Sequence, residues 1–166
     1  LFNLNSFSLY FLNIKWKISN FFQFKNFAVY KSFNVESFFL PNLNSLQKKI
    51  NKNLFNSIYP KIKDKSDLLN LKIKNIFIGD LIYNSYLLEF KKTINIENDD
   101  FKDYLYKSIS LFVFWYDYLK THNVKAIVLT HSVYSSAINL RIALKMGIPT
   151  YSANDEIIFK FTKNNL

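Results

Sequence analysis

Residues 124–152 read VKAIVLTHSVYSSAINLRIALKMGIPTYS and alternate between extended and helical patterns. Residues 124–130 form an apolar, largely β-branched run, which is typical of a buried parallel strand. Residues 133–146 repeat apolar side chains at helical spacing, and the following Gly147 is a common residue at a helix C-terminus. Residues 148–152 are extended again. This order predicts a βαβ unit and hence an α/β fold, with a Rossmann-like parallel sheet flanked by helices.

Two further helices are predicted upstream of this unit. Residues 43–58 place apolar side chains three and four positions apart after a candidate cap, Asn42 or Asn44. A longer helix begins after Asn98, where two aspartates suit the positive N-terminal end, and should end near His122. Apolar residues on two of its sides predict that this helix is buried between layers.

Several shorter segments have weaker patterns. Residues 27–30 (FAVY) and 37–40 (SFFL) are apolar runs that could be buried strands, and residues 93–96 (TINI) are extended in pattern. Residues 72–78 fit a strand or a loop equally well. Ser66 is a candidate cap for a short turn between these segments.

The composition limits both the domain organisation and the chemistry. The chain has 166 residues, enough for one domain, which we place at residues 27–166 after an unassigned segment, 1–26. It contains no cysteine, so thiolate metal sites, disulfides and a cysteine nucleophile are excluded. Two histidines exclude a His-rich metal site, and two glycines exclude Gly-rich nucleotide loops. No cofactor and no metal are therefore expected.

The net charge of +10 raises the alternative of a basic module that binds RNA or an anionic membrane surface. Of the 22 basic residues, however, only Arg141 is an arginine, and the chain also holds 21 asparagines. Lys, Asn, Ile, Phe and Tyr are the residues that AT-rich codons encode, so the lysine excess follows from composition. We therefore expect solvated lysines and no nucleic-acid partner.

No apolar stretch approaches the roughly 18 residues of a membrane-spanning helix, and no signal-peptide pattern is present. The expected location is the cytoplasm. Peripheral association with the inner face of the cytoplasmic membrane is compatible with this expectation.

Ligands of open parallel sheets bind beyond the carboxyl ends of the strands, which here are residues 130–132 and 153–156. His131 is a candidate general base or phosphate contact, or a histidine that only bonds a neighbouring loop. Ser132 is predicted as the cap of the next helix, whose free N–H groups favour an anion. Asp155 either lines the cleft or is solvent-exposed.

Asp80 follows Gly79 at the predicted start of another helix. It is an ordinary N-cap, or a carboxylate that serves as a base or binds hydroxyl groups in a cleft. Tyr83 lies three residues further on and could share a helix face with Asp80. Aromatic rings beside carboxylates suit sugar binding and a core edge equally. Arg141 is predicted as a surface cation or a member of an ion pair.

Three segments resemble a known family. Residues 78–87 (IGDLIYNSYL) are similar to the IGDLIYDSYLR stretch of bacterial proteins of capsular and other surface-polysaccharide biosynthesis. Residues 125–151 resemble that family's strand–HxxY–helix–GIPVY pattern, and residues 29–33 its YKSFG element. The sequence departs from these patterns at Asn84, where the family has Asp, at Leu88 for Arg, and at Asn34 for Gly.

The resemblance implies a glycosyltransferase of the two-domain GT-B type, of which this chain would be the N-terminal, acceptor-side half. His131 and Asp80 would face the cleft, where one of them deprotonates the acceptor hydroxyl. Ser132, Tyr134, Tyr83 and Asp155 would contact substrate. The chain would be a fragment, inactive by itself, with the nucleotide-sugar donor bound by a further C-terminal domain.

The partners implied are thus a nucleotide sugar and a glycan or lipid-linked acceptor. Two alternatives stay open beside the transferase. One is the basic α/β binding module already described, whose binding would weaken steeply with salt. The other is a scaffold of a polysaccharide-synthesis complex.

Overall fold

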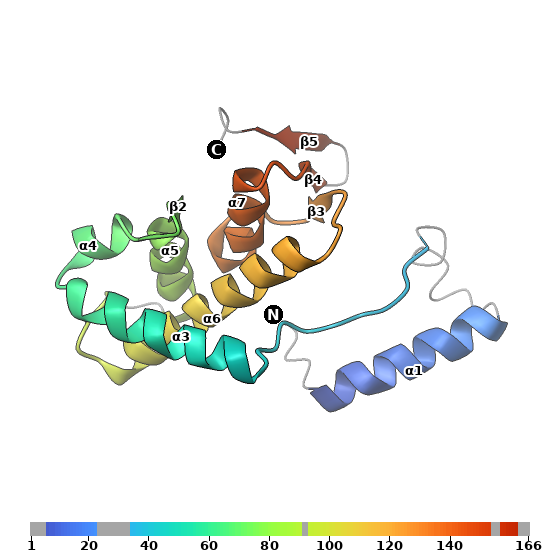
Figure 1. Ribbon diagram of the computed structural model, residues 1–166, viewed down its shortest axis with the longest axis horizontal. Coiled ribbons are helices and arrows are strands. Elements are labelled where there is room, and N and C mark those ends of the chain that lie inside the picture. Colours follow the sequence, from blue (N-terminus) through green and yellow to red (C-terminus); the bar gives the residue numbers. More distant parts are fainter. Residues whose placement is uncertain (1–5, 23–33, 91–92, 154–156, 163–166) are drawn as a thin grey trace. The chain divides into compact units, whose positions relative to one another are not determined.

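The computed structural model describes residues 6–22, 34–90, 93–153 and 157–162 (Figure 1). The chain divides into two compact units, Leu1–Asn42 and Leu43–Leu166. The predicted boundary after residue 26 and the candidate strand at residues 27–30 lie outside the described residues.

The first unit contains the helix α1 (Ser6–Phe22), in a region whose sequence has no assignable pattern. The Asn13 carboxamide donates to the Phe38 carbonyl at 2.8 Å and accepts from the Phe38 N–H at 2.9 Å. The Trp16 ring contacts the Phe38 ring edge-on. The described residues 37–40 form no strand, so that prediction is wrong. Asn13 occupies both backbone groups of Phe38 that a sheet would need.

In the second unit, α3 (Ser45–Ile58) and α6 (Asp99–Thr121) pack against each other (Figure 1). Both confirm the sequence prediction. Asn44 and Gln47 form a reciprocal capping box at the start of α3. Asn98 caps α6, and His122 is its C-cap. Pro60 lies in a short 3-10 turn, η2 (Tyr59–Lys61), that follows α3.

A small hairpin follows the short helix α4 (Lys65–Leu69). The N-cap of α4 is Asp64 rather than the predicted Ser66, because the Asp64 carboxylate accepts the Asp67 N–H. The strands are β1 (Lys72–Ile73) and β2 (Ile76–Phe77), paired antiparallel. Lys74 and Asn75 connect them with φ of 52° and 60°, as a type I′ turn requires. This turn explains why residues 72–78 have no clear strand period.

The helix α5 (Gly79–Phe90) begins directly after this hairpin, and its first residue is buried. A Cβ at Gly79 would lie 1.8 Å from the Leu68 carbonyl oxygen, so only glycine fits between α4 and α5. The Gly79 N–H donates to the Leu71 carbonyl. This close approach places Asp80, the next residue, in the first turn of α5.

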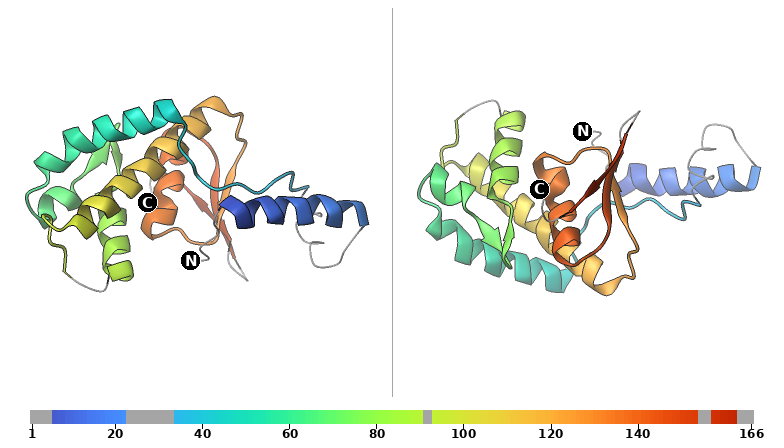
Figure 2. Two further views of the ribbon diagram at one scale, coloured as in Figure 1. Left: turned by 90° about the horizontal axis from the view of Figure 1, so that it is seen from below. Right: turned by 90° about the horizontal axis from the view of Figure 1, so that it is seen from above.

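The predicted βαβ unit is present at residues 127–153 (Figure 2). Its elements are β3 (Ile127–Leu129), η3 (Tyr134–Ala137), α7 (Ile138–Lys145) and β4 (Thr150–Ala153). β3 and β4 are parallel, and β5 (Ile158–Phe161) pairs antiparallel with β4. Gly147, with φ of 76°, ends the helical segment as predicted.

The protein is therefore α/β, with helices and two small sheets, and the described residues hold one parallel pair of strands. Within those residues, no strand forms at 93–96, and residues 72–77 pair with each other instead of joining the larger sheet. The first strand is also shorter and less buried than predicted, since the Val128 side chain is 66% exposed. A wider Rossmann-like sheet is not seen in the described chain.

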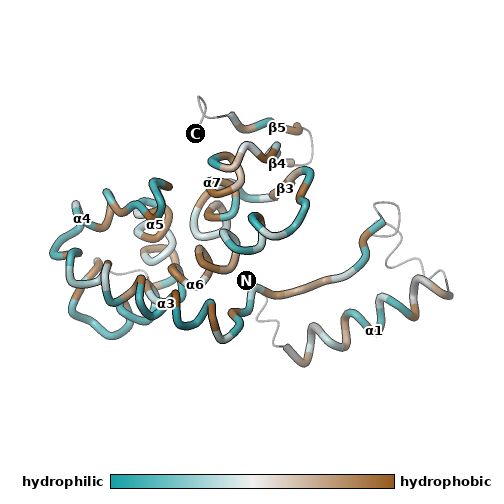
Figure 3. The backbone as a smooth tube through the Cα atoms, viewed as in Figure 1, coloured by the Kyte–Doolittle hydropathy of each residue, from teal (hydrophilic) through white to brown (hydrophobic). Residues whose placement is uncertain are grey.

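The core of the second unit lies mainly among α5, α6 and α7, which Figure 3 shows as helices with hydrophobic segments. Tyr86, Phe101 and Ile138 are fully buried representatives of these helices. α7 contacts both α6 and the strands β3 and β4. Among the described residues, no helix is both long and apolar enough to cross a membrane.

Candidate functional site

An ion pair between α5 and α7 is the centre of the candidate site. The Arg141 guanidinium donates to both Asp80 oxygens, from Nη1 at 2.6 Å and from Nη2 at 2.7 Å. Nη1 also donates to the Phe77 carbonyl at 2.8 Å. The Arg141 and Asp80 side chains are 18% and 30% exposed, so the pair is partly shielded from water. Two parallel N–H···O bonds fix the orientation of both groups.

An open groove of about 500 Å³ lies on one side of this pair. α5 supplies Asp80 and Asn84, the segment before η3 supplies Ser132, and η3 begins with Tyr134. Arg141 completes the polar lining. Apolar side chains from the same two segments form the remaining wall: Leu81, Leu87, Leu88 and Val133.

A second open groove, of about 590 Å³, lies against the same ion pair. It is lined by Asp80 and Arg141 together with the hairpin residues Asn75, Ile76 and Phe77, and with Leu144 and Lys145 of α7. The Arg141 Cζ lies 5.6 Å from the centre of the Phe77 ring, a cation–π contact that holds this ring beside the pair. The two grooves thus share Asp80 and Arg141.

Tyr134 has a strained backbone at the wall of the first groove. Its φ of 61° is in the left-handed region, which is unfavourable for a bulky side chain. The next residue is anchored to α5, because the Ser135 N–H donates to Ser85 Oγ at 2.6 Å. The Tyr104 hydroxyl lies beside Ser85 and Ser135, and burial raises the pKa of Tyr104. Strain of this kind persists where the surrounding structure enforces it, often at ligand sites.

The structure brings three of the sequence-predicted site residues into one groove: Asp80, Ser132 and Tyr134. Ser132 is not a helix cap. The N-cap of η3 is Val133, and no side chain of the described residues caps it. Asp80 lies inside the first turn of α5, and its carboxylate binds Arg141. The prediction of an ion pair for Arg141 is confirmed.

The other predicted residues lie elsewhere. His131 is exposed and precedes Ser132, but within the described chain it lines neither groove. Tyr83 is half-buried and packs on the core, and the Lys65 ammonium lies 4.7 Å from its ring centre. Tyr83 therefore does not join Asp80 in the described grooves. Asp155 lies outside the described residues.

Sequence reasoning did not select Arg141, Asn84 or Phe77 as site residues. Arg141 could have been found from composition, because it is the only arginine in a chain whose other cations are all lysine. Arginine is the residue that binds a carboxylate with two parallel bonds. Asn84 was noted only as a departure from the family motif, and Phe77 carries no local signal of a site.

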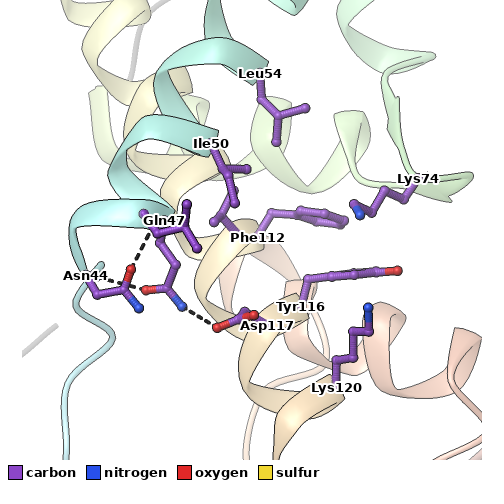
Figure 4. A pocket seen from close by; sticks show the side chains of 11 residues that line it. Asn44, Gln47, Ile50, Leu54, Lys74, Phe112, Tyr116, Asp117 and Lys120 are labelled. Carbon is purple, nitrogen blue, oxygen red and sulfur yellow. Dashed lines mark hydrogen bonds between the residues drawn. The ribbon is translucent and has the colours of Figure 1, made fainter.

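A smaller groove of about 240 Å³ lies between α3 and α6 (Figure 4). Its floor is apolar, and the Lys74 ammonium lies 4.3 Å from the centre of the Tyr116 ring. Its main polar groups bind each other, since Gln47 bonds Asn44 and donates to Asp117 Oδ2 at 2.6 Å. These side chains support the packing of α3 on α6. We therefore place the candidate site at the Asp80–Arg141 pair.

The paired grooves offer hydrogen-bonding oxygens, carboxamides and aromatic rings at an open surface, a set that suits a ligand rich in hydroxyl groups. The described residues contain no group of three or more His, Cys, Asp or Glu side chains placed to hold a metal ion. Comparison of the chain with protein-family models, with curated proteins and with solved structures finds no match.

Proposed function

We propose that this chain is the acceptor-side part of a glycosyltransferase in bacterial surface-polysaccharide biosynthesis. The observation that carries the proposal is the groove shared by Asp80, Ser132 and Tyr134. Asp80 belongs to the IGDLIY motif, and Ser132 and Tyr134 belong to the HxxY motif. Two motifs that resemble one family thus contribute to a single groove, although about fifty residues separate them.

Transfer requires the acceptor hydroxyl oxygen to attack the anomeric carbon of the donor sugar. The bond from that carbon to the nucleotide breaks, the nucleotide leaves with the bonding electrons, and the hydroxyl proton passes to a base. Asp80 would accept a hydrogen bond from the acceptor, because Arg141 holds its carboxylate in one orientation. His131 lines neither groove but is exposed and directly precedes the groove residue Ser132, and from there it would take the proton.

The finer fold belongs to the same proposal. The parallel β3–α7–β4 unit supports a Rossmann-like half of a GT-B enzyme, in which a further domain binds the nucleotide sugar. The acceptor would be a glycan or a lipid-linked glycan. The site would lie at the cytoplasmic side of the membrane, where nucleotide sugars are available.

The alternative of a basic binding module has less support. Several lysines lie over aromatic rings, including Lys65 over Tyr83 and Lys74 over Tyr116. Such ammonium groups are engaged by the protein surface itself. The single arginine is bound to Asp80. Phosphate recognition would thus depend on scattered lysines, which bind as point charges.

Transfer of labelled sugar from a panel of nucleotide sugars, assayed with the full-length protein, tests the proposal. We expect His131→Ala to lower kcat by about 100-fold or more, as for loss of a general base. Asp80→Asn should lower kcat/KM, because it weakens the contact with the acceptor and releases Arg141. Circular dichroism checks that both variants remain folded.

Two matched controls separate the site from general damage. His122→Ala removes the other histidine, which stacks on Tyr118 at the end of α6. Asp117→Asn alters a half-buried carboxylate that accepts from Gln47 in the groove between α3 and α6. Both controls should retain activity. Full turnover in both His131→Ala and Asp80→Asn would refute the assignment.

A further inference from the structure

We infer that the two grooves beside Asp80 and Arg141 form one continuous track for a neutral oligosaccharide, with at least one sugar unit on each side of the ion pair. The inference rests on the proposed function and names the acceptor class more closely. The acceptor would then contain more than one sugar unit.

Continuity follows from the shared lining. Asp80 and Arg141 line the groove of about 500 Å³ and also that of about 590 Å³. The ion pair is partly exposed, and in the inferred track it lies between the two open grooves. A ligand that lies across the ion pair would contact both grooves at once.

The two grooves also carry the same kinds of side chain. On the hairpin side, Asn75 supplies a carboxamide and Phe77 supplies an aromatic ring. On the η3 side, Asn84 and Tyr134 supply the same two groups. The Phe77 and Tyr134 residues are 36% and 39% exposed, so both are partly accessible, and the Arg141 and Lys72 cations lie beside the Phe77 ring. A ring packs against the apolar face of a sugar, and a carboxamide both donates to and accepts from its hydroxyls.

The charges at the centre favour a neutral ligand. The Arg141 guanidinium is bound at both ends of the Asp80 carboxylate, so the two formal charges cancel locally. A phosphate or carboxylate ligand would have to displace Asp80 or lie beside it, which costs free energy by like-charge repulsion. A sugar hydroxyl meets no such penalty. Each Asp80 oxygen keeps a further lone pair that can accept from a hydroxyl.

Lys145 lines the hairpin-side groove and is exposed. A solvated ammonium can donate to hydroxyls without selecting an anion. The presence of Lys145 also makes it possible to test whether the groove prefers acidic or neutral glycans. If Lys145 and Arg141 together selected an acidic glycan, uronic-acid oligosaccharides would bind more tightly than neutral ones.

Amide chemical shifts of the 166-residue chain, titrated with defined sugars, test the track. The neutral probes are maltotetraose, cellotetraose, laminaritetraose and chitotetraose, with glucose and N-acetylglucosamine as their monomers. An oligogalacturonate is the acidic probe. We expect at least one neutral tetrasaccharide to shift amides of both grooves in one titration and to bind more tightly than its monomer.

Two variants connect the binding to the rings. Phe77→Ala and Tyr134→Asn should each weaken binding of that tetrasaccharide by about fivefold. Asn is used at position 134 because it tolerates the left-handed backbone, so the variant tests the ring and not the strain. Phe159→Ala and Tyr106→Ala are matched controls, because both remove exposed rings outside the two grooves and should leave binding unchanged.

Shifts confined to one groove, equal affinity for tetrasaccharide and monomer, tighter binding of the oligogalacturonate, or no binding of any tetrasaccharide would each overturn the track. The transferase proposal is judged separately by sugar transfer. Loss of transfer in Asp80→Asn with shifts in one groove only would mean a short acceptor. Binding in both grooves without any transfer would keep the track and reject the transferase.

Discussion

Two helix starts in the second unit are built in opposite ways. At the start of α6, the Asn98 side chain accepts the Asp100 N–H, and two aspartates occupy the first turn. The start of η3, which leads into α7, has Val133 at the cap position and no capping side chain among the described residues. It also contains the left-handed Tyr134.

The start of η3 and α7 is instead stabilised by residues that are distant in sequence. Ser85 accepts the Ser135 N–H, and Asp80 binds Arg141, so α5 provides both fixed points. The start of a capped helix such as α6 is stabilised by residues within its first turn. The start of η3 depends on tertiary contacts instead. Of these two contacts, the Asp80–Arg141 pair also lines both candidate grooves. The start of η3 thus contains a strained Tyr134 and lacks the side-chain cap that α6 has in the described residues.

The largest effect should come from Gly79→Ala. The new Cβ would overlap the Leu68 carbonyl oxygen, and the backbone of α4 or α5 must move. We expect a loss of about 3 kcal/mol in the free energy of unfolding. Urea denaturation measures it. Amide shifts should change at Ser135, which α5 holds, and should stay unchanged at Asp100, which its own cap holds.

Gly147→Ala is the matched control for this substitution. No atom lies within 4 Å of a Cβ at Gly147, but its φ of 76° is unfavourable for alanine. Its cost should be about 1 kcal/mol, from backbone strain alone. Equal losses for both variants would show that the close approach of α4 to α5 does not determine the start of α5.

The next effect concerns the Asp80–Arg141 pair. A double-mutant cycle with Asp80→Asn and Arg141→Gln should give a coupling energy of about 2 kcal/mol, because the bonds are bidentate and partly shielded. The unfolding free energies of the four proteins supply the cycle.

The ion pair between Lys102 and Asp99 at the start of α6 is the comparison case. It is exposed, and its partners are three residues apart in one helix. The cycle with Asp99→Asn and Lys102→Gln should show no coupling beyond error, since surface pairs are screened. A coupling as strong as that of Asp80 with Arg141 would remove the distinction between the two helix starts.

The smallest expected effect is a difference in unfolding free energy between substitutions of two buried serines. Ser85 and Ser108 are equally buried, and each donates to the carbonyl four residues earlier in its own helix. Ser85 alone of these two accepts a bond from another element, the Ser135 N–H. Ser85→Ala should therefore cost about 1 kcal/mol more than Ser108→Ala in thermal or urea unfolding. Equal costs would mean that Ser85 does not hold the start of η3.

Much of the second unit could be predicted from neighbouring residues. The Asn44 and Asn98 caps, the apolar faces of α3 and α6, and Gly147 after α7 are all local signals, and the structure contains each of them. The parallel strands of the βαβ unit followed from the same kind of pattern. Such features depend on residues a few positions apart.

The errors arose where distant residues compete for the same backbone groups. Residues 37–40 have a strand pattern, but the Asn13 side chain binds both backbone groups of Phe38. Serine is a common cap residue, but Ser132 does not cap this helix. Instead, the Ser85–Ser135 bond and the Asp80–Arg141 ion pair connect the segment to α5. A pattern of single residues cannot show which partner is closer in space.

The candidate site divides in the same way. The motifs identified Asp80, Ser132 and Tyr134 but gave no reason for Arg141 to face Asp80 across 61 residues of chain. Sequence by itself determined where α3 and α6 begin and where the α7 segment ends, because a cap or a terminal glycine acts within one helical turn. Only the tertiary structure decided which side chains share a groove, because the packing of α5 against η3 and the ion pair between α5 and α7 bring together groups that no local interaction connects.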